Sequence, residues 1–211
     1  VPQYLLELNP ALSLHQNLNE YAFKSSGFFF REFDRLFVSH FAQHPTYEQA
    51  LRALSERRMT PTELAAKCQL TGGGTLSARI KELELAGFVR VLSPVDKPPN
   101  SRLIQYSLDD EYLHFYFRFI EPHSAEIVSG NVSFSQLAAS RAFEQWRGYA
   151  FERLCRKHAR QFADHLRFGG VSHRSGAWFQ RGTANRAGGQ IDLLFVRADK
   201  VLTVCEMKYA D

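Results

Sequence analysis

Cysteine is scarce in this sequence and long apolar runs are missing, and each absence excludes a class of protein. The 211 residues include three cysteines, Cys68, Cys155 and Cys205, which form no C-x-x-C pair. Such spacing indicates neither a disulfide framework nor a cysteine zinc site. No apolar run reaches the roughly 18 residues that a membrane span needs, and the N-terminus lacks a secretory-signal layout. We therefore expect a cytoplasmic protein with no membrane partner.

The sequence also contains no internal repeat and no low-complexity tract, and its composition suits ordinary globular cores. Hydrophobic residues make up 45% and aromatic residues 13%, which is enough for one large or two small domains. The net charge of +4 is unevenly spread, because ten Lys and Arg face only Glu144, Glu152 and Asp164 between residues 141 and 190. This stretch suits phosphate contacts, and a solvated face without a partner explains its charge equally well.

Residues 1–44 are expected to be helical, with Phe30, Phe33 and Phe37 on one stripe that packs in a core. Tyr47 to Arg57 is expected to form the next helix. Thr60-Pro61-Thr62-Glu63 is a capping box that opens another helix, through Cys68.

The stretch from Gly72 to Leu108 completes a recognisable module. After a tight turn at Gly72 to Gly74, a third helix is expected from Thr75, ending at Gly87 in a left-handed cap. Strands are expected at 88–92 and 103–108, with a proline-rich turn between them. Three helices followed by a hairpin predict a winged helix.

In a winged helix the third helix enters the major groove of DNA. The residues that we expect to contact nucleic acid there are Thr75, Ser77, Arg79 and Lys81. Winged helices also serve as protein-interaction or spacer modules, so this alternative stays open.

Beyond the winged helix, periodicity predicts a helix over 109–120 and a long helix from Phe143 that carries Phe151, Leu154, Cys155, His158 and Phe162 on one stripe. Residues 169–176 and 182–189 are expected to be glycine-rich breaks. Strands are expected at 191–196 and 201–207, joined by a short turn as an antiparallel pair.

The residues that could carry chemistry gather on these last elements. Glu206 and Lys208 are two apart, so they project from one side of a strand, and Asp192 can project beside them from its neighbour. Carboxylates are ligands that Mg²⁺ accepts together with water and substrate phosphate, and a nearby lysine can orient water or stabilise developing charge. An exposed ion pair and unrelated surface carboxylates are the alternative.

The order of Glu152 on a helix, Asp192 on a strand, and Glu206-Met207-Lys208 after a hairpin resembles the PD-(D/E)xK nuclease superfamily. This resemblance implies Asp192 and Glu206 as ligands of Mg²⁺ or Mn²⁺. It also implies that Lys208 positions the attacking water and that Glu152 is an accessory ligand or base. Arg153 and Arg156, on the basic stretch, would hold the DNA backbone.

Other segments resemble a longer architecture. The segments are Val1-Pro2-Gln3-Tyr4-Leu5-Leu6, Gln105-Tyr106-Ser107-Leu108-Asp109-Asp110 and Phe115-Tyr116-Phe117-Arg118-Phe119. They are similar to the C-terminal part of archaeal-type AAA+ ATPases, where an ATPase lid leads into a winged helix and then a DUF234 nuclease-like domain. The resemblance implies an ATPase region of the same longer chain as a partner.

Two departures from that family bear on activity. No G-x-x-x-x-G-K-[ST] loop occurs, so we expect no ATPase activity from this chain alone. The chain also stops directly after the Glu-x-Lys strand, whereas the family pattern continues with a helix and a strand. We expect a fragment whose open sheet edge is covered by a missing segment or by a second copy in a homo-oligomer.

We therefore expect an α+β or α/β protein whose last domain is truncated if the chain is a fragment. The expected domains are a lid-like helical segment at 1–44, a winged helix at 45–125 and a PD-(D/E)xK nuclease-like, DUF234-like domain at 126–211. The leading hypothesis is a Mg²⁺-dependent deoxyribonuclease. The alternatives are a non-catalytic module that binds DNA or a partner for the ATPase, and an oligomerisation tail.

Overall fold

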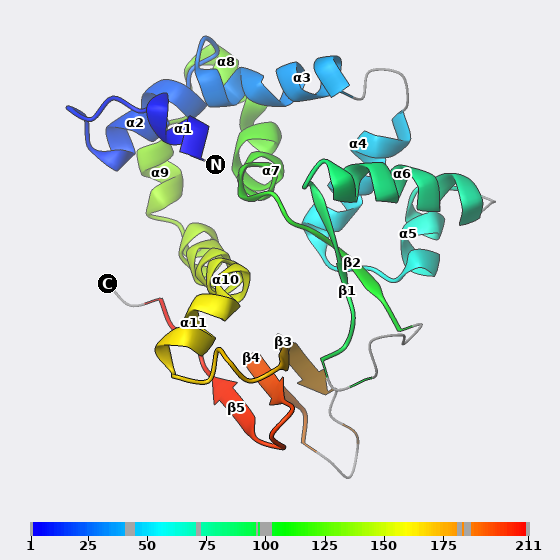
Figure 1. Ribbon diagram of the computed structural model, residues 1–211. Helices are drawn as coiled ribbons and strands as arrows, with labels where there is room; N and C mark the ends of the chain where they lie inside the picture. Colours follow the sequence, from blue (N-terminus) through cyan, green and yellow to red (C-terminus); the bar gives the residue numbers. More distant parts are fainter. Residues whose placement is uncertain are drawn as a thin grey trace. The chain divides into compact units, whose positions relative to one another are not determined.

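The computed structural model describes residues 2–40, 45–70, 73–95, 97, 103–180, 183 and 187–209 (Figure 1). They divide into two compact units. Unit 1 comprises residues 1–92 and 105–143, and unit 2 comprises residues 93–104 and 144–211. The three expected domains stay a prediction. In the part of the chain described, no helix is long and apolar enough to cross a membrane.

The N-terminal part of unit 1 is helical, as expected, with helices α1 (Pro2–Leu6), α2 (Leu14–Ala22) and α3 (Phe28–His40). Phe33 is buried and stacks on Tyr116, with ring centroids 4.3 Å apart. The Tyr112 hydroxyl donates to the Phe29 carbonyl at 2.9 Å. These contacts join α3 to the segment after the winged helix; the side chain of Phe37 lies outside the described residues.

The winged helix has the expected order of elements. It consists of α4 (Pro45–Glu56), α5 (Pro61–Lys67), α6 (Gly73–Leu85), β1 (Val89–Leu92) and β2 (Gln105–Leu108). The strands pair antiparallel from Val89 opposite Leu108 to Leu92 opposite Gln105. Gly87 has φ 81° and closes α6, while the Phe88 amide donates to the Leu83 carbonyl at 2.9 Å. The tight turn expected at Gly72 to Gly74 is wrong in part, because Gly73 and Gly74 already belong to α6. Gly72 and most of the tip of the β1–β2 hairpin lie outside the described residues.

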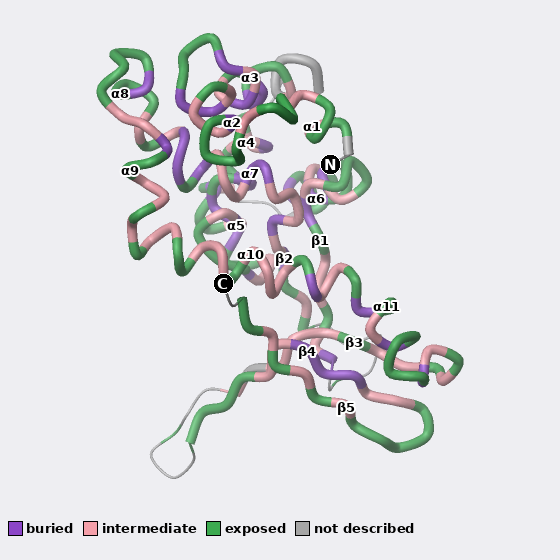
Figure 2. Tube along the Cα trace, turned by 90° about the vertical axis from the view of Figure 1, so that its left-hand side faces the viewer, coloured by how far each residue is buried: buried purple, intermediate pink, exposed green. Residues whose placement is uncertain are grey.

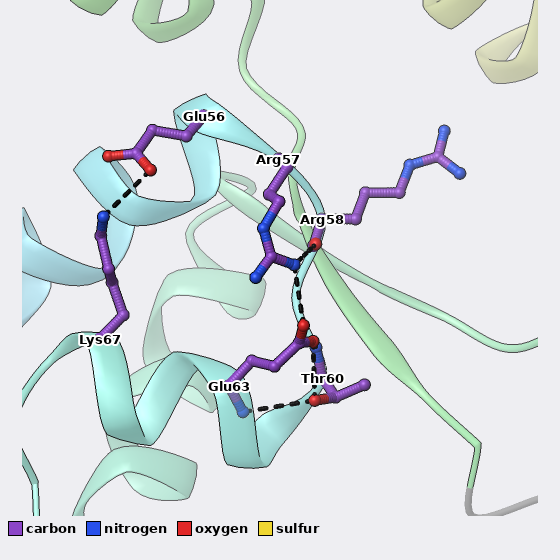
Figure 3. A network of polar contacts seen from close by, with 6 residues as sticks. All are labelled: Glu56, Arg57, Arg58, Thr60, Glu63 and Lys67. Carbon is purple, nitrogen blue, oxygen red and sulfur yellow. Dashed lines mark hydrogen bonds and ion pairs between the residues drawn. The ribbon is translucent and has the colours of Figure 1, made fainter.

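The predicted capping box at the start of α5 is confirmed. Thr60 accepts from the Glu63 amide at 3.3 Å, and Glu63 accepts from the Thr60 amide at 2.8 Å. Arg57 donates to Glu63 at 2.9 Å, and Lys67 pairs with Glu56 at 3.1 Å across the turn between α4 and α5 (Figure 3). The turn is therefore held by side chains as well as by its own backbone.

The helix expected over 109–120 is two elements. Asp110 caps α7 (Glu111–Phe115), and a π-helical turn, η1 (Tyr116–Ile120), follows it. The wider turn places Phe117, Phe119 and Ile120 in the core. Three short helices complete unit 1, namely η2 (Glu121–His123), α8 (Ser124–Ser129) and α9 (Phe134–Ala138).

Unit 2 packs helices against a small sheet. Helix α10 (Arg141–Lys157) begins in unit 1 and leads to α11 (Ala159–His165), β3 (His173–Gln180), β4 (Gly189–Arg197) and β5 (Leu202–Cys205). The strand order is β3-β4-β5, and both pairings are antiparallel. Leu193 and Phe195 form a buried cluster with Ala159, Ala163 and Phe168. Figure 2 shows the buried residues of β4 and the exposed turn before β5.

Two expectations about this unit are wrong. The long helix breaks at His158, where α11 begins as a separate helix, so Phe162 is not on the same helix as Phe151 and Leu154; Leu154 and His158 are exposed. The expected break at 169–176 contains the start of β3, because β3 gains its hydrogen bonds from β4, which is distant in sequence. Since both sheets are antiparallel, the fold class is α+β.

Candidate functional site

The register of β4 and β5 sets Asp192 beside the segment that carries Glu206 and Lys208. Leu193 pairs with Cys205, and Leu194 pairs with Val204. Continued by one residue, this register sets Asp192 opposite Glu206, and directly opposed residues share a face. Lys208 lies two residues further on, beyond the end of β5 at Cys205. These three residues are called the carboxylate–lysine cluster below.

Asp192 is fixed by the backbone that carries the other members of the cluster. Its Oδ2 accepts from the Met207 amide at 2.8 Å, and its Oδ1 accepts from Gln190 Nε2 at 3.3 Å. The expected strand through Met207 ends at Cys205. The Asp192 side chain therefore ties the segment beyond β5 to β4 where the regular strand has ended.

Glu206 and Lys208 face solvent and pair with each other. Lys208 Nζ lies 3.2 Å from Glu206 Oε1, and their side chains are 76% and 73% exposed. An ion pair this exposed contributes little to stability. Both side chains can therefore exchange this contact for a ligand at low cost.

Glu152 reaches the same strand through an arginine. Its Oε2 lies 3.4 Å from Arg156 Nη1, and the same nitrogen lies 3.4 Å from the Asp192 carbonyl oxygen. The Glu152 and Arg156 side chains are only 18% and 16% exposed. Arg156 thus joins α10 to β4, and the Glu152 carboxylate is beside the guanidinium group rather than in the cluster.

Tyr209 holds the end of the described chain against α10. The Arg147 guanidinium lies 4.8 Å from the centre of the Tyr209 ring, and the Phe151 ring packs edge-on at 5.9 Å. Because Tyr209 follows Lys208 directly, these contacts limit the positions that Lys208 can adopt. Neither the packing of Tyr209 nor the bridging role of Arg156 follows from the local sequence pattern. For Tyr209, the available signal was an aromatic residue directly after Glu-x-Lys.

The donor set suits a hard divalent cation that is held by few protein ligands. Asp192 and Glu206 supply carboxylate oxygens on one face, and Mg²⁺ often binds through one or two carboxylates with water and substrate phosphate. Among the described residues, no group of three or more His, Cys, Asp or Glu side chains could hold a metal ion. Any cation at this place would therefore rest on two protein carboxylates and not on a closed protein cage. Burial raises the pKa of the Cys155 and Cys205 thiols, which makes them weak metal ligands and nucleophiles.

The predicted DNA-contacting residues of α6 differ in their availability. Thr75 and Ser77 are exposed near its N-terminal end. Arg79 instead lies over the Tyr47 ring at 5.2 Å and donates to the Tyr47 hydroxyl at 2.8 Å. Lys81 pairs with Glu84 at 2.8 Å.

The charges on α6 also offset one another, because Arg79 and Lys81 are accompanied by Glu82 and Glu84. On α10, the small exposed fraction of Arg156 leaves little of its side chain for phosphate, and Arg153 is of intermediate exposure. Exposed Arg160 and Arg167 follow it in the basic stretch.

A comparison with known protein families finds a match in the second half of the chain. Residues 116–211 match DUF234, a family described as archaea bacterial proteins of unknown function. This match agrees with the DUF234 part of the resemblance seen in the sequence.

An uncharacterized protein, MJECL04 of Methanocaldococcus jannaschii, is 23% identical over 212 residues, covering all of this chain and 46% of that protein. The chain thus spans about half the length of the curated relative that it matches. A crystal structure of the adhesin competence repressor AdcR from Streptococcus pyogenes overlays with a TM-score of 0.32 and 16% identity, covering 64% of this chain and 91% of that one. The winged-helix description rests on this chain's own helix order and strand pairing.

Proposed function

We propose that this chain binds DNA and that unit 2 hydrolyses DNA phosphodiester bonds with the help of Mg²⁺ or Mn²⁺. The observation that carries the proposal is the 2.8 Å hydrogen bond from the Met207 amide to Asp192, which ties Asp192 to the segment where Glu206 and Lys208 pair with each other. Two carboxylates and an ammonium group are groups that metal-assisted phosphodiester hydrolysis can use.

Each residue of the proposed site has its own role, which depends on its position. Asp192 and Glu206 would hold the cation, which when bound lowers the pKa of water and offsets charge on the phosphate. Lys208 orients the attacking water, and its exposed side chain can move from Glu206 to a substrate oxygen. Glu152 acts as an accessory base or ligand only after leaving Arg156, so we assign it the smallest contribution.

DNA contact is proposed for both units. On α6, Thr75 and Ser77 are exposed, whereas Arg79 and Lys81 must exchange contacts with Tyr47 and Glu84 to reach DNA. In unit 2, the excess of arginine between residues 141 and 190 supplies the charge for backbone contacts, from Arg153 and, to a smaller extent, Arg156.

The test is cleavage of labelled supercoiled, linear and branched DNA with Mg²⁺ or Mn²⁺. Asp192→Ala and Lys208→Ala should each lower the rate by roughly a hundredfold or more, because each removes a group used in the chemical step. Asp164→Ala, which removes an exposed carboxylate on α11 of the same unit, is the matched control and should cleave normally. Cleavage that persists in Asp192→Ala would rule out this site as its source.

A second candidate function is a non-catalytic module that binds DNA or a partner. The observation in its favour is that Glu152 and Glu206 already have basic partners, Arg156 and Lys208. DNA binding without cleavage by any version, including a chain that continues beyond Asp211, would favour this function. Salt-dependent binding measured by fluorescence anisotropy separates it from an oligomerisation tail, which needs no DNA affinity.

The partner that we propose is an ATPase region of the same longer chain. The length of the relative, of which this chain covers 46%, leaves room for such a region. Co-purification of this chain with a separately expressed ATPase region would support the pairing. Light scattering at several concentrations would test for a homo-oligomer.

A further inference from the structure

Unit 1 contains a cavity of about 910 Å³ between α2 and the start of α3, and the proposed nuclease site in unit 2 does not use it. Its charged lining residues are Glu20, Lys24, Arg31 and Arg35, and Glu32 pairs with Arg35 at 3.7 Å, so three basic groups are accompanied by two acidic ones. Small-ligand sites usually measure roughly 300 to 1,000 Å³. This cavity is therefore large enough for a ligand of nucleotide size.

The walls of the cavity are held by a buried polar side chain and by close backbone packing. Asn17, which is 4% exposed, accepts from the Asn9 amide at 2.7 Å and donates to the Asn9 and Leu12 carbonyls at 2.9 and 3.1 Å. Asn9 and Leu12 line the cavity. On the other wall, a Cβ on Gly27 would lie 2.5 Å from the Tyr21 carbonyl oxygen, so only glycine fits there. The cavity therefore has preformed walls on α2 and α3.

Its two arginines are oriented but have donors to spare. Arg31, an exposed residue, uses Nε to donate to the Ser25 carbonyl at 2.8 Å, an arrangement that fixes the side chain. Arg35 lies over the Phe28 ring at 5.1 Å, and its nearest carboxylate, Glu32, is 3.7 Å away, beyond hydrogen-bond distance. Lys24 is held by Glu20 at 2.6 Å.

We propose that this cavity binds a small molecule carrying a phosphate or diphosphate group. Arginine presents a planar fork of donors that matches phosphate oxygens, and its charge-assisted hydrogen bonds are stronger than neutral ones. Arg31 and Arg35 bind the phosphate, and Lys24 adds charge by exchanging Glu20 for the ligand. The amides of Gln16 and Asn19, which also line the cavity, contact the remainder of the molecule.

Titration calorimetry on the full chain tests this site with inorganic pyrophosphate, ADP and uncharged adenosine as probes. Arg31→Gln/Arg35→Gln should bind pyrophosphate and ADP roughly a hundredfold more weakly, because each arginine that is replaced removes a charge-assisted hydrogen bond worth about tenfold in affinity. Lys67→Gln/Arg90→Gln removes the same charge from exposed ion pairs elsewhere in unit 1 and should bind normally. Circular dichroism checks folding, and Arg35→Gln alone should show the tenfold step if the double variant is unstable.

Three results would overturn the proposal. They are absence of binding by both phosphate probes, equal weakening in the control variant, and adenosine binding as tightly as ADP. A duplex oligonucleotide identifies the source of the phosphate: if it displaces ADP and also loses affinity in Arg31→Gln/Arg35→Gln, the site is part of a DNA surface and the small-molecule assignment fails. DNA cleavage by unit 2 should be unchanged in this double variant, which keeps the two proposals separable.

Discussion

Unit 1 and unit 2 differ in how much apolar packing supports them. Among the largest fully buried side chains of the described residues, Leu193 and Phe195 alone belong to unit 2, whereas Leu51, Leu83 and Leu113 are examples from unit 1. In unit 2 the sheet leaves Leu202 and Val204 exposed, at 63% and 61%. The carboxylate–lysine cluster therefore belongs to the less deeply packed unit.

This difference indicates a division between stability and chemistry. In unit 1 the polar groups mostly complete local structure, as in the Thr60 and Glu63 capping box. In unit 2 the exposed Glu206 and Lys208 pair with each other, and such groups are available to a ligand. Four measurements would sharpen this comparison or contradict it.

The largest expected effect comes from removing core side chains in each unit. Leu83→Ala and Phe195→Ala should each lower the free energy of unfolding by about 2–5 kcal/mol, because both side chains are fully buried. Both tryptophans, Trp146 and Trp178, are in unit 2, so tryptophan fluorescence follows the unfolding of that unit in urea. The circular dichroism signal comes mainly from helices and reports the loss of helical structure. If Leu83→Ala shifts the fluorescence transition as much as Phe195→Ala does, the units do not unfold separately.

A smaller effect is expected at the start of α5. Thr60→Ala should cost about 1 kcal/mol, because it removes the side chain that caps the Glu63 amide. Thr60→Ser keeps the hydroxyl group and is the matched control. Thermal unfolding followed by circular dichroism measures both, and an equal loss in the two variants would show that the Thr60 methyl group, not the cap, is responsible.

Tyr209→Leu tests the corresponding anchor in unit 2. It removes the Arg147 contact and the Phe151 ring pair, which are together worth about 1 kcal/mol. Hydrogen exchange at the Met207 amide should therefore become faster, and cleavage of DNA should fall severalfold. Tyr209→Phe retains the ring and should resemble the unmodified chain; unchanged exchange in Tyr209→Leu would mean that Asp192 alone fixes this segment.

The smallest effect is a pH dependence in unit 1. Hydrogen bonds from the Thr60 backbone and hydroxyl and from Arg57 lower the pKa of Glu63 from 4.5 to about 2. The unfolded chain therefore binds this proton first, so the contribution of Glu63 to stability is present above pH 4.5 and is lost as the pH falls toward 2. Because Glu63 is exposed, the change is small. Glu63→Gln should flatten the melting temperature across this window, and an unaltered pH profile would contradict the assignment.

Local patterns predicted the winged helix well. The Thr60 to Glu63 box, the glycine that closes α6 and the alternation of the hairpin strands all act within a few residues, so neighbouring residues suffice to infer them. The antiparallel strands around Asp192 and Glu206 were predicted for the same reason, since a short turn joins them. The choice of Asp192, Glu206 and Lys208 as site residues stays a prediction.

The failures involve partners that are distant in sequence. The glycine-rich pattern of residues 169–176 predicts a break, while pairing from His173 with Arg197 to Gln180 with Gly189 stabilises β3 there. Arg79 stays a proposed DNA contact, but local sequence did not indicate that Tyr47 on another helix provides both a ring and a hydroxyl for it. In each case the deciding contact is made by a residue that local periodicity does not include.

The sequence by itself determined the kinds of element and the faces on which their side chains lie, because capping, turn chemistry and alternation depend on neighbours. That Asp192, Glu206 and Lys208 act together as one site stays a prediction, because β5 ends at Cys205, before Glu206 and Lys208. Tertiary structure alone decided that Glu152 pairs with Arg156, that Tyr209 packs on α10 and that a basic cavity forms between α2 and α3. These features depend on which surfaces come together when apolar side chains leave water, and that choice is made by the whole chain.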